Sequence, residues 1–154
     1  MSARGTIISA IKTMLGKITT EPVGETPSPY STDFDAVYEW KTTPFSADEQ
    51  AVNVMDLMDD IEEEERNVFH KHTLHVEIQI KMATGKSISD VRTAVTDVYK
   101  AISLDSTWDN VKYMMMPEGD EIGVEQDEYT YFTASIKLAV QFRTPAWSAS
   151  VINS

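Results

Sequence analysis

The chain has 154 residues, the usual size of one domain, and we expect residues 1–154 to form a single one. It contains no cysteine, which excludes disulfides, thiolate metal sites and a cysteine nucleophile. Its 25 acidic and 13 basic residues give a formal net charge of −12, so it repels the phosphates of duplex DNA and of anionic membranes.

The N-terminus shows no targeting segment. It meets Lys12 after only a few apolar residues, whereas a signal peptide needs about 7–15 consecutive ones. No apolar run approaches the about 20 residues that cross a bilayer. We therefore expect a protein with no export signal and no membrane segment.

The first regular element that the sequence predicts is a helix from Thr6 to Ile18, capped by Ser2 or Thr6. Its apolar residues recur at helical spacing: Ile7, Ile11, Met14 and Ile18. Residues 19–35 contain prolines and a glycine and show no periodicity. We expect a long loop there, or an arm that touches a neighbouring molecule.

Two strands are predicted next. Aromatic and β-branched residues fill 36–43, and this strand should end before Pro44. A second strand runs over 51–61 toward solvent. It leads into a nearly unbroken acidic block, which consists of Asp59, Asp60, Glu62, Glu63, Glu64 and Glu65.

Such a block of like charges repels itself, so we expect it at the solvated far end of a long acidic β-hairpin, with Arg66 and Asn67 turning the chain back. Two other interpretations stay open. The block provides oxygen ligands for a hard cation such as Mg²⁺ or Ca²⁺, or it lines a channel and keeps DNA from adhering.

The second half of the chain predicts a strand, a helix and further strands. Residues 74–82 alternate between apolar and polar side chains, and this is the clearest strand pattern. Ser87 or Ser89 should cap a helix that ends around Leu104. A strand over 111–116 should stop at Pro117.

A short strand should follow around Ile122 and Val124, and a long one over 129–143. We expect residues 144–154 to form an irregular C-terminal tail. Strands that alternate along their length favour an antiparallel or mixed sheet that is open on one face. With both helices on the other face, the chain is expected to form a two-layer α+β sandwich.

Motifs for catalysis are missing from the sequence. There is no Gly-x-Ser-x-Gly elbow and no glycine-rich phosphate loop, so we expect no enzyme, no catalytic residue and no cofactor. On a strand, His70 and His72 share one side and His75 takes the other. The simplest interpretation is that the histidines are polar residues on the solvent-exposed side of a hairpin strand. Two other interpretations are a metal site completed by the acidic block and a pH-sensitive interface.

Aromatic and basic residues near the loops and the last strand are the candidate subunit or partner contacts. They are Trp40, Phe45, Tyr131, Arg143, Pro145 and Trp147. Trp147 is favoured most, because an exposed Trp after an irregular Thr144-Pro145 pair suits a partner's pocket. Trp40 and Trp108 are more often anchors of packing than ligand cages, and Met114–Met116 more often fill a core than serve an interface.

Several short motifs resemble the tail terminator, or minor tail, proteins of long-tailed bacteriophages. Besides the N-terminal helix and the acidic hairpin, the matching segments are Val37–Phe45 (VYEWKTTPF), His72–Ile78 (HTLHVEI), Ser89–Arg92 (SDVR) and Val140–Trp147 (VQFRTPAW). The resemblance spans about Thr6 to Trp147. One departure is Glu49-Gln-Ala-Val, where the family often has a Leu-Pro pair before the second strand.

This resemblance implies a structural virion protein that forms a homo-oligomeric ring, typically a hexamer, at the head-proximal end of the tail. The ring caps the tail tube, ends tail polymerisation and joins the neck and head, while DNA passes through without specific binding. Its partners would be the tail tube protein and a neck or head-completion protein, met in the host cytoplasm during assembly. The alternatives are another neck (head-completion or stopper) protein, a metal-binding module or enzyme using His70 and His72, and a module that binds a small ligand between sheet and helices.

Overall fold

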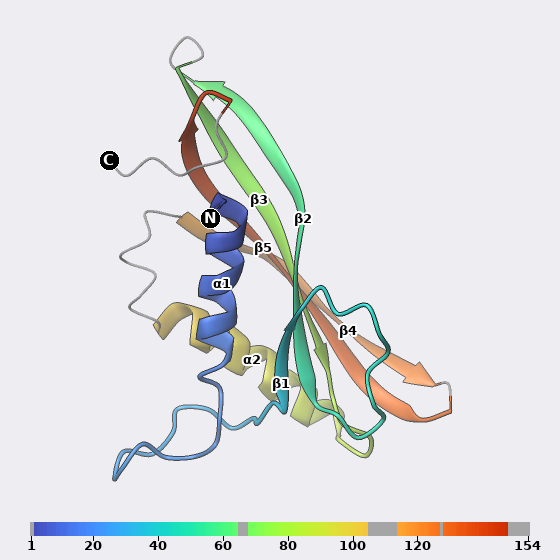
Figure 1. The fold of residues 1–154 in the computed structure, drawn as a ribbon. Helices are drawn as coiled ribbons and strands as arrows, with labels where there is room; N and C mark the ends of the chain where they lie inside the picture. The colour runs from blue at the N-terminus through green and yellow to red at the C-terminus, as the bar shows by residue number, and fades with distance from the viewer. Residues whose placement is uncertain (1, 65–67, 105–113, 127, 148–154) are drawn as a thin grey trace.

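The computed structural model describes residues 2–64, 68–104, 114–126 and 128–147. Two helices and a five-stranded mixed sheet make up the fold, so the expected α+β class is confirmed (Figure 1). In chain order the elements are α1 (Ala3–Leu15), β1 (Ala36–Glu39), β2 (Ala51–Glu64), β3 (Phe69–Lys81), α2 (Ile88–Leu104), β4 (Met114–Gln126) and β5 (Thr130–Pro145). The strands are ordered β1-β2-β3-β5-β4 across the sheet.

Both helices begin at the serine caps that the sequence predicts. Ser2 Oγ accepts a hydrogen bond from the Gly5 amide at the start of α1. At α2, Ser87 and Asp90 form a reciprocal capping box, in which the Asp90 amide donates to Ser87 Oγ and the Ser87 amide donates to Asp90 Oδ2. These caps satisfy amides that have no partner within the helix.

The centre of the sheet is antiparallel. β2 pairs with β3, β3 with β5 and β5 with β4, whereas β1 joins in parallel and covers only Ala51–Val54 of β2. The cross-strand register places Val54, Ile78 and Ile136 side by side. Because side chains alternate between faces, this register aligns the apolar residues of β3 with those of β5 and of the first part of β2 on one face.

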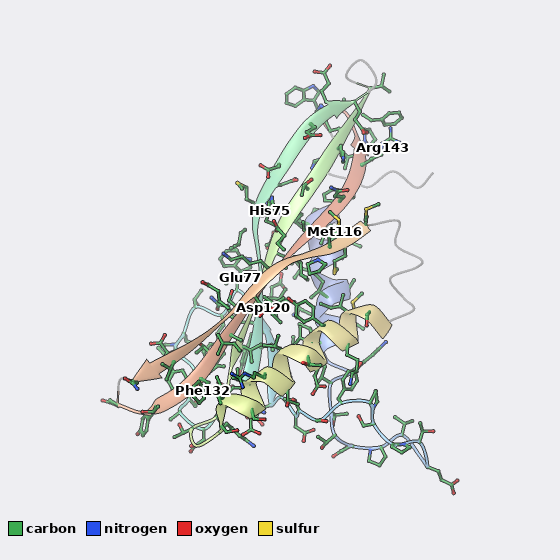
Figure 2. The ribbon with its side chains drawn as sticks, turned by 180° about the vertical axis from the view of Figure 1, so that it is seen from behind. His75, Glu77, Met116, Asp120, Phe132 and Arg143 are labelled. Carbon is green, nitrogen blue, oxygen red and sulfur yellow. The ribbon has the colours of Figure 1, made fainter. Side chains whose placement is uncertain are left out.

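Both helices contribute to one apolar cluster with that face. The cluster includes Ile7 and Ile11 of α1 and Val91 and Val98 of α2, all fully buried against strand residues such as Ile78. The opposite face is polar along most of its length and neither helix covers it. Figure 2 views the molecule from behind and labels His75 and Glu77, which lie on this uncovered face.

The sheet extends beyond the helices at both ends. The β2–β3 pair and the end of β5 continue past the N-terminus of α1, and the β4–β5 pair continues past α2 in the other direction (Figure 1). We call the first of these extensions the distal arm, formed by residues 57–64, 68–74 and 140–147. It carries the acidic block, which was expected at the tip of a hairpin.

The acidic side chains belong to a paired strand. Asp59 lies opposite Leu74, and Glu64 lies opposite Phe69, so the block from Asp59 to Glu64 is part of β2. Basic and imidazole side chains of the neighbouring strands offset its self-repulsion. Glu65, Arg66 and Asn67 lie outside the described residues.

Several predicted boundaries were wrong. The first helix spans Ala3–Leu15 instead of Thr6–Ile18, because the chain leaves the helix at Gly16. β2 continues past 61 to Glu64, and β3 begins at Phe69 and not at 74, because the two strands remain paired along the acidic block.

β1 ends at Glu39 because Trp40 takes a left-handed conformation (φ 48), while its amide still donates to the Val54 carbonyl. β4 passes through Pro117 as one strand, since a bulge between Pro117 and Gly119 absorbs the proline. β5 includes Thr144 and Pro145, which were expected in the irregular tail.

Residues 19–35 form no helix or named strand, and the Val23–Thr26 bridge makes a local turn within them. Trp108, residues 111–113 of the predicted fourth strand, and the rest of the tail at 148–154 fall outside the described part of the chain.

Candidate functional site

An open cavity of about 670 Å³ lies between the start of α1 and the distal arm. It is lined by Ser2, Ala3, Arg4, Asp59, Ile61, Glu63, His70, His72, Phe142 and Trp147. The lining combines apolar walls with two carboxylates, two imidazoles and a guanidinium. Residues far apart in the sequence meet here because the strand register brings β2, β3 and β5 together under the helix terminus.

A chain of hydrogen bonds crosses the floor of this cavity. His72 Nδ1 lies 2.7 Å from Asp59 Oδ2, and its Nε2 lies 2.8 Å from Thr144 Oγ1. The order carboxylate, imidazole, hydroxyl resembles the arrangement that activates a hydroxyl nucleophile. Thr144, however, is completely buried, so its Oγ1 offers no surface to a substrate. This arrangement supports a structural role for His72.

The imidazole of His72 is also held by packing. Its ring stacks on Phe142 with centroids 4.6 Å apart and planes inclined by 10°. The second carboxylate oxygen of Asp59, Oδ1, is buried and has no hydrogen-bond partner within the described residues. The pair of His72 and Asp59 therefore anchors the arm to the core. Its net stabilisation is reduced because Asp59 Oδ1 is buried without a hydrogen-bond partner in the described part of the chain.

His70 and Trp147 form the outer wall of the cavity. The Trp147 amide donates to His70 Nδ1 at 3.4 Å, and the two rings meet edge to face at 5.4 Å. Trp147 has a positive φ of 62, and its side chain is 88% exposed. The strongest sequence candidate for a partner contact is thus placed on the surface, beside a buried imidazole.

The histidines do not gather as a metal centre in the described structure. His70 and His72 share a face, as predicted, and His75 lies on the other. Both ring nitrogens of His72 bind protein groups. Within residues 2–64, 68–104, 114–126 and 128–147, no three His, Asp or Glu side chains are arranged to hold a metal ion.

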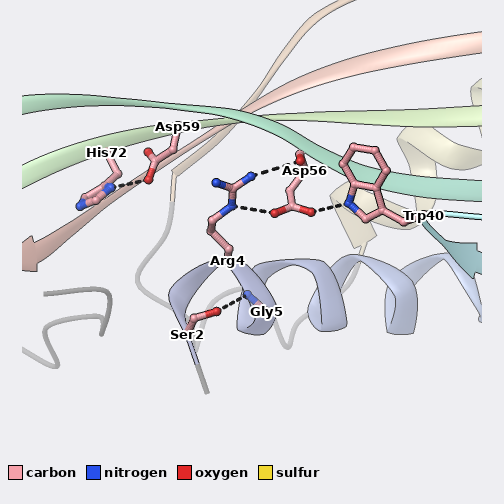
Figure 3. A network of polar contacts seen from close by, with 7 residues as sticks. All are labelled: Ser2, Arg4, Gly5, Trp40, Asp56, Asp59 and His72. Atoms are coloured by element: carbon pink, nitrogen blue, oxygen red, sulfur yellow. Dashed lines mark hydrogen bonds and ion pairs between the residues drawn. The ribbon is translucent and has the colours of Figure 1, made fainter.

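Asp56 connects the cavity to the start of the sheet (Figure 3). Its Oδ2 accepts from Arg4 Nε at 2.6 Å, and its Oδ1 accepts from Trp40 Nε1 at 2.7 Å. Burial alone would raise the pKa of the Asp56 carboxyl, but the hydrogen bonds from Trp40 and Arg4 outweigh it and hold this pKa below its usual value. Trp40, a predicted contact residue, is half exposed and fixed by this bond.

Phe45 and Tyr131 line a second cavity, of about 570 Å³, on the uncovered face. Lys81 lines the same cavity, is 4% exposed, and its Nζ donates to the carbonyls of Ala47, Glu49 and Met82. The ammonium also lies 4.6 Å from the centroid of the Tyr131 ring. Burial lowers the pKa of Lys81, and the negative charges of Glu49, Asp48 and Asp35 oppose this shift only in part.

Arg143 and Pro145 lie on the distal arm. Arg143 Nε donates to Glu64 Oε2 at 2.8 Å, and its guanidinium lies 4.7 Å from the Phe69 ring. Pro145 is exposed and sits opposite Phe69. The six predicted contact residues are therefore divided among three places: Trp40 near the end of β1, the second cavity, and the distal arm.

Sequence reasoning missed several of these groups. Asp56, Lys81 and Thr144 carry no motif, and their importance arises mainly from partners more than ten residues away. For Lys81, one signal was available: a lysine that closes an alternating strand just before buried Met82.

Neither helix that the structure describes has the length and apolar character that crossing a bilayer requires. A comparison of the sequence with models of known protein families and with curated protein sequences finds no match.

Proposed function

We propose that this protein is a structural assembly subunit of the tail terminator kind, which forms a ring with copies of itself and caps a phage tail tube. The proposal rests on the sequence resemblance and on the form of the distal arm. The ring would end tube growth, join the neck and head, and let DNA pass. Its work would be done by binding, with no bond made or broken.

The observation that carries the proposal is the apolar surface of the distal arm. Leu57, Met58, Ile61, Val68 and Trp147 are all exposed at this one end of the sheet. Ile61 and Trp147 also line the open cavity beside the start of α1. Apolar side chains gathered on one projecting part of a molecule support a protein contact there.

The sheet edges favour contacts through the arm and faces over edge-to-edge pairing of strands. The outer edge of β2 beyond Val54 has a bulge between Asp56 and Met58 and is acidic. The β4 edge has the Pro117–Gly119 bulge and carries Glu118 and further acidic residues. Bulges, prolines and like charges are the usual devices that prevent strand addition. Copies of this chain would also repel each other at these edges.

The acidic side chains support a passive role toward DNA. Glu62 and Glu63 are exposed on the arm, and no cluster of basic residues accompanies them within β2. If the arms face the lumen of a ring, they repel the phosphate backbone and reduce friction. Binding of duplex DNA is expected to be negligible at physiological salt.

The experiment compares tails assembled with and without this protein by electron microscopy. Overlong tubes in its absence support the terminator. Tails of normal length that fail to join heads would instead support the other neck proteins. Adding back the purified protein should restore the length distribution.

A variant that removes the proposed contact makes the experiment specific. Ile61→Ser with Trp147→Ala should fail to restore tube length, whereas Thr96→Ala, on the exposed side of α2, should restore it. Full activity of the double variant would refute the distal arm as the contact surface.

A further inference from the structure

His75 lies between two carboxylates that come from different strands. Its Nδ1 is 2.8 Å from Glu118 Oε1 of β4, and its Nε2 is 2.8 Å from Asp60 Oδ2 of β2. His75 itself belongs to β3, on the face that neither helix covers. One ring thus connects the acidic strand to the outermost strand on the other side of the sheet.

Both contacts require a proton on the ring nitrogen. A neutral imidazole has one N–H donor and one acceptor, while an ionised carboxylate only accepts. In neutral His75, one ring nitrogen would turn its lone pair toward a carboxylate oxygen at 2.8 Å, which is repulsive. The arrangement therefore needs the imidazolium form, with charge-assisted bonds on both sides.

The backbone of β4 is shaped for this contact. Glu118 is the extra residue of the bulge between Pro117 and Gly119, so it has no partner in the β5 register. Gly119 has a φ of 143, a conformation that other residues rarely adopt, although a Cβ there would meet nothing within 4 Å. The glycine is thus required for its conformation and not for space.

A small residue allows Glu118 to reach across β5. Ala139 lies directly between His75 and Met116 in the strand register. It is only 5% exposed, although it belongs to the uncovered face. The pair of His75 and Glu118 is positioned above it, and a larger side chain at 139 would block the path.

We propose that His75 is a pH-sensitive clamp: its protonated ring holds the bulged edge strand β4 and the acidic strand β2 to β3, and loss of the proton frees Glu118 and loosens the bulge. This inference does not depend on the proposed function. It describes a conformational device in the sheet itself.

The two carboxylates that contact His75 favour its protonated form. Asp60 faces it from β2 and Glu118 from β4, while β5 presents Lys137 on the same face, opposite Glu77 of β3. Lys71 lies on the same face of β3, four residues before His75. Hydrogen bonds to Glu118 and then Asp60 raise the pKa of His75 above its ordinary value, against a smaller opposing effect of burial.

A raised folded-state pKa sets the sign of the pH dependence. The stabilisation is complete below the unfolded pKa of about 6.5 and is lost as pH rises through the higher folded value. The clamp is therefore closed at mildly acidic pH and opens on the alkaline side.

The test is an NMR titration of the three histidines in the intact protein, with amide hydrogen exchange of β4 measured over the same pH range. The His75 midpoint should lie above about 6.5. Through that midpoint, the protection factors of β4 amides near Gly119 should fall roughly two- to fivefold, after correction for the intrinsic exchange rate.

Variants assign the effect to the clamp. Glu118→Gln and Asp60→Asn should each lower the His75 midpoint, whereas Glu121→Gln, an equal charge change elsewhere on β4, should leave it unchanged. A wild-type midpoint at or below about 6.5, or one that Glu118→Gln does not lower, would overturn the proposal. So would a raised midpoint with no change in β4 protection, and this outcome needs only the wild-type protein.

Discussion

The ring of His72 lies flat on the ring of Phe142, with centroids 4.6 Å apart. This contact marks where the apolar core ends within the distal arm. On the core side, Leu74 and Val140 are fully buried, and on the outer side the surface becomes acidic and partly apolar. The stability of the arm therefore depends on this stacked pair more than on its outermost residues.

Truncating Phe142 should destabilise the protein strongly. Phe142 is 4% exposed, so Phe142→Ala removes buried apolar area and leaves a cavity under His72. We expect a loss of about 3 kcal/mol in the free energy of unfolding, measured by urea denaturation. Phe142→Leu should cost less than half of that, and equal costs for the two variants would contradict the packing described for this pair.

Replacing Asp56 should remove a link between α1, β2 and Trp40. Asp56→Asn weakens the bond from Arg4, so the unfolding free energy should fall by about 1–2 kcal/mol at neutral pH. Because the folded pKa of Asp56 is depressed, its stabilisation is present above about 3.9 and is lost as pH falls through the folded value.

The pH dependence separates this effect from a general loss of stability. Asp56→Asn should flatten the decline in stability below about pH 4. Asp48→Asn, in an exposed loop position, serves as the control and should leave the decline in stability at acidic pH unchanged. If Asp56→Asn shows the same decline in stability at acidic pH as the wild type, the stabilising role of the ionised Asp56 carboxylate would be refuted.

Lys81 is predicted to be a structural cation. Lys81→Met keeps most of the side-chain volume but removes the ammonium that donates to the carbonyls of Ala47, Glu49 and Met82. The Ala47 carbonyl still accepts from Thr84, so the loss falls mainly on Glu49 and Met82. We expect a cost of about 1–3 kcal/mol in thermal or urea unfolding. Lys137→Met, an exposed lysine on the same face, should change stability by less than about 0.5 kcal/mol.

The bulge in β4 should tolerate no side chain at position 119. Gly119→Ala forces an alanine into a positive φ of 143 and is expected to cost about 1–3 kcal/mol. Gly123→Ala tests the neighbouring glycine, where the added Cβ would meet Thr133 Oγ1 at 3.1 Å and displace a side chain. The two costs therefore have different origins, and only Gly119→Ala should lower the His75 midpoint.

Local patterns predicted much of the fold. The alternation in 74–82 and 129–143 identified the two central strands, because each presents one face to a core and the other to water. Ser87 and the apolar spacing identified α2. Position 117 was interpreted incorrectly because a proline within an apolar segment usually ends a strand, while an edge strand accommodates it in a bulge.

The candidate site was less accessible from the sequence. The acidic block was expected to be solvated. The sequence suggested that histidines of the returning strand lie near it, but not that Asp59 pairs with His72, Asp60 with His75 and Glu64 with Arg143. Those contacts depend on strand register across β2, β3 and β5. Trp147 was identified because its exposure follows from a local feature, the turn after the last strand.

The most direct test of an assembly role is the native mass of the purified protein over a range of micromolar concentrations. The proposed function predicts a closed oligomer of identical subunits that dissociates in Ile61→Ser with Trp147→Ala. A wild-type protein that stays monomeric at every concentration, both alone and with tail tubes, would contradict it.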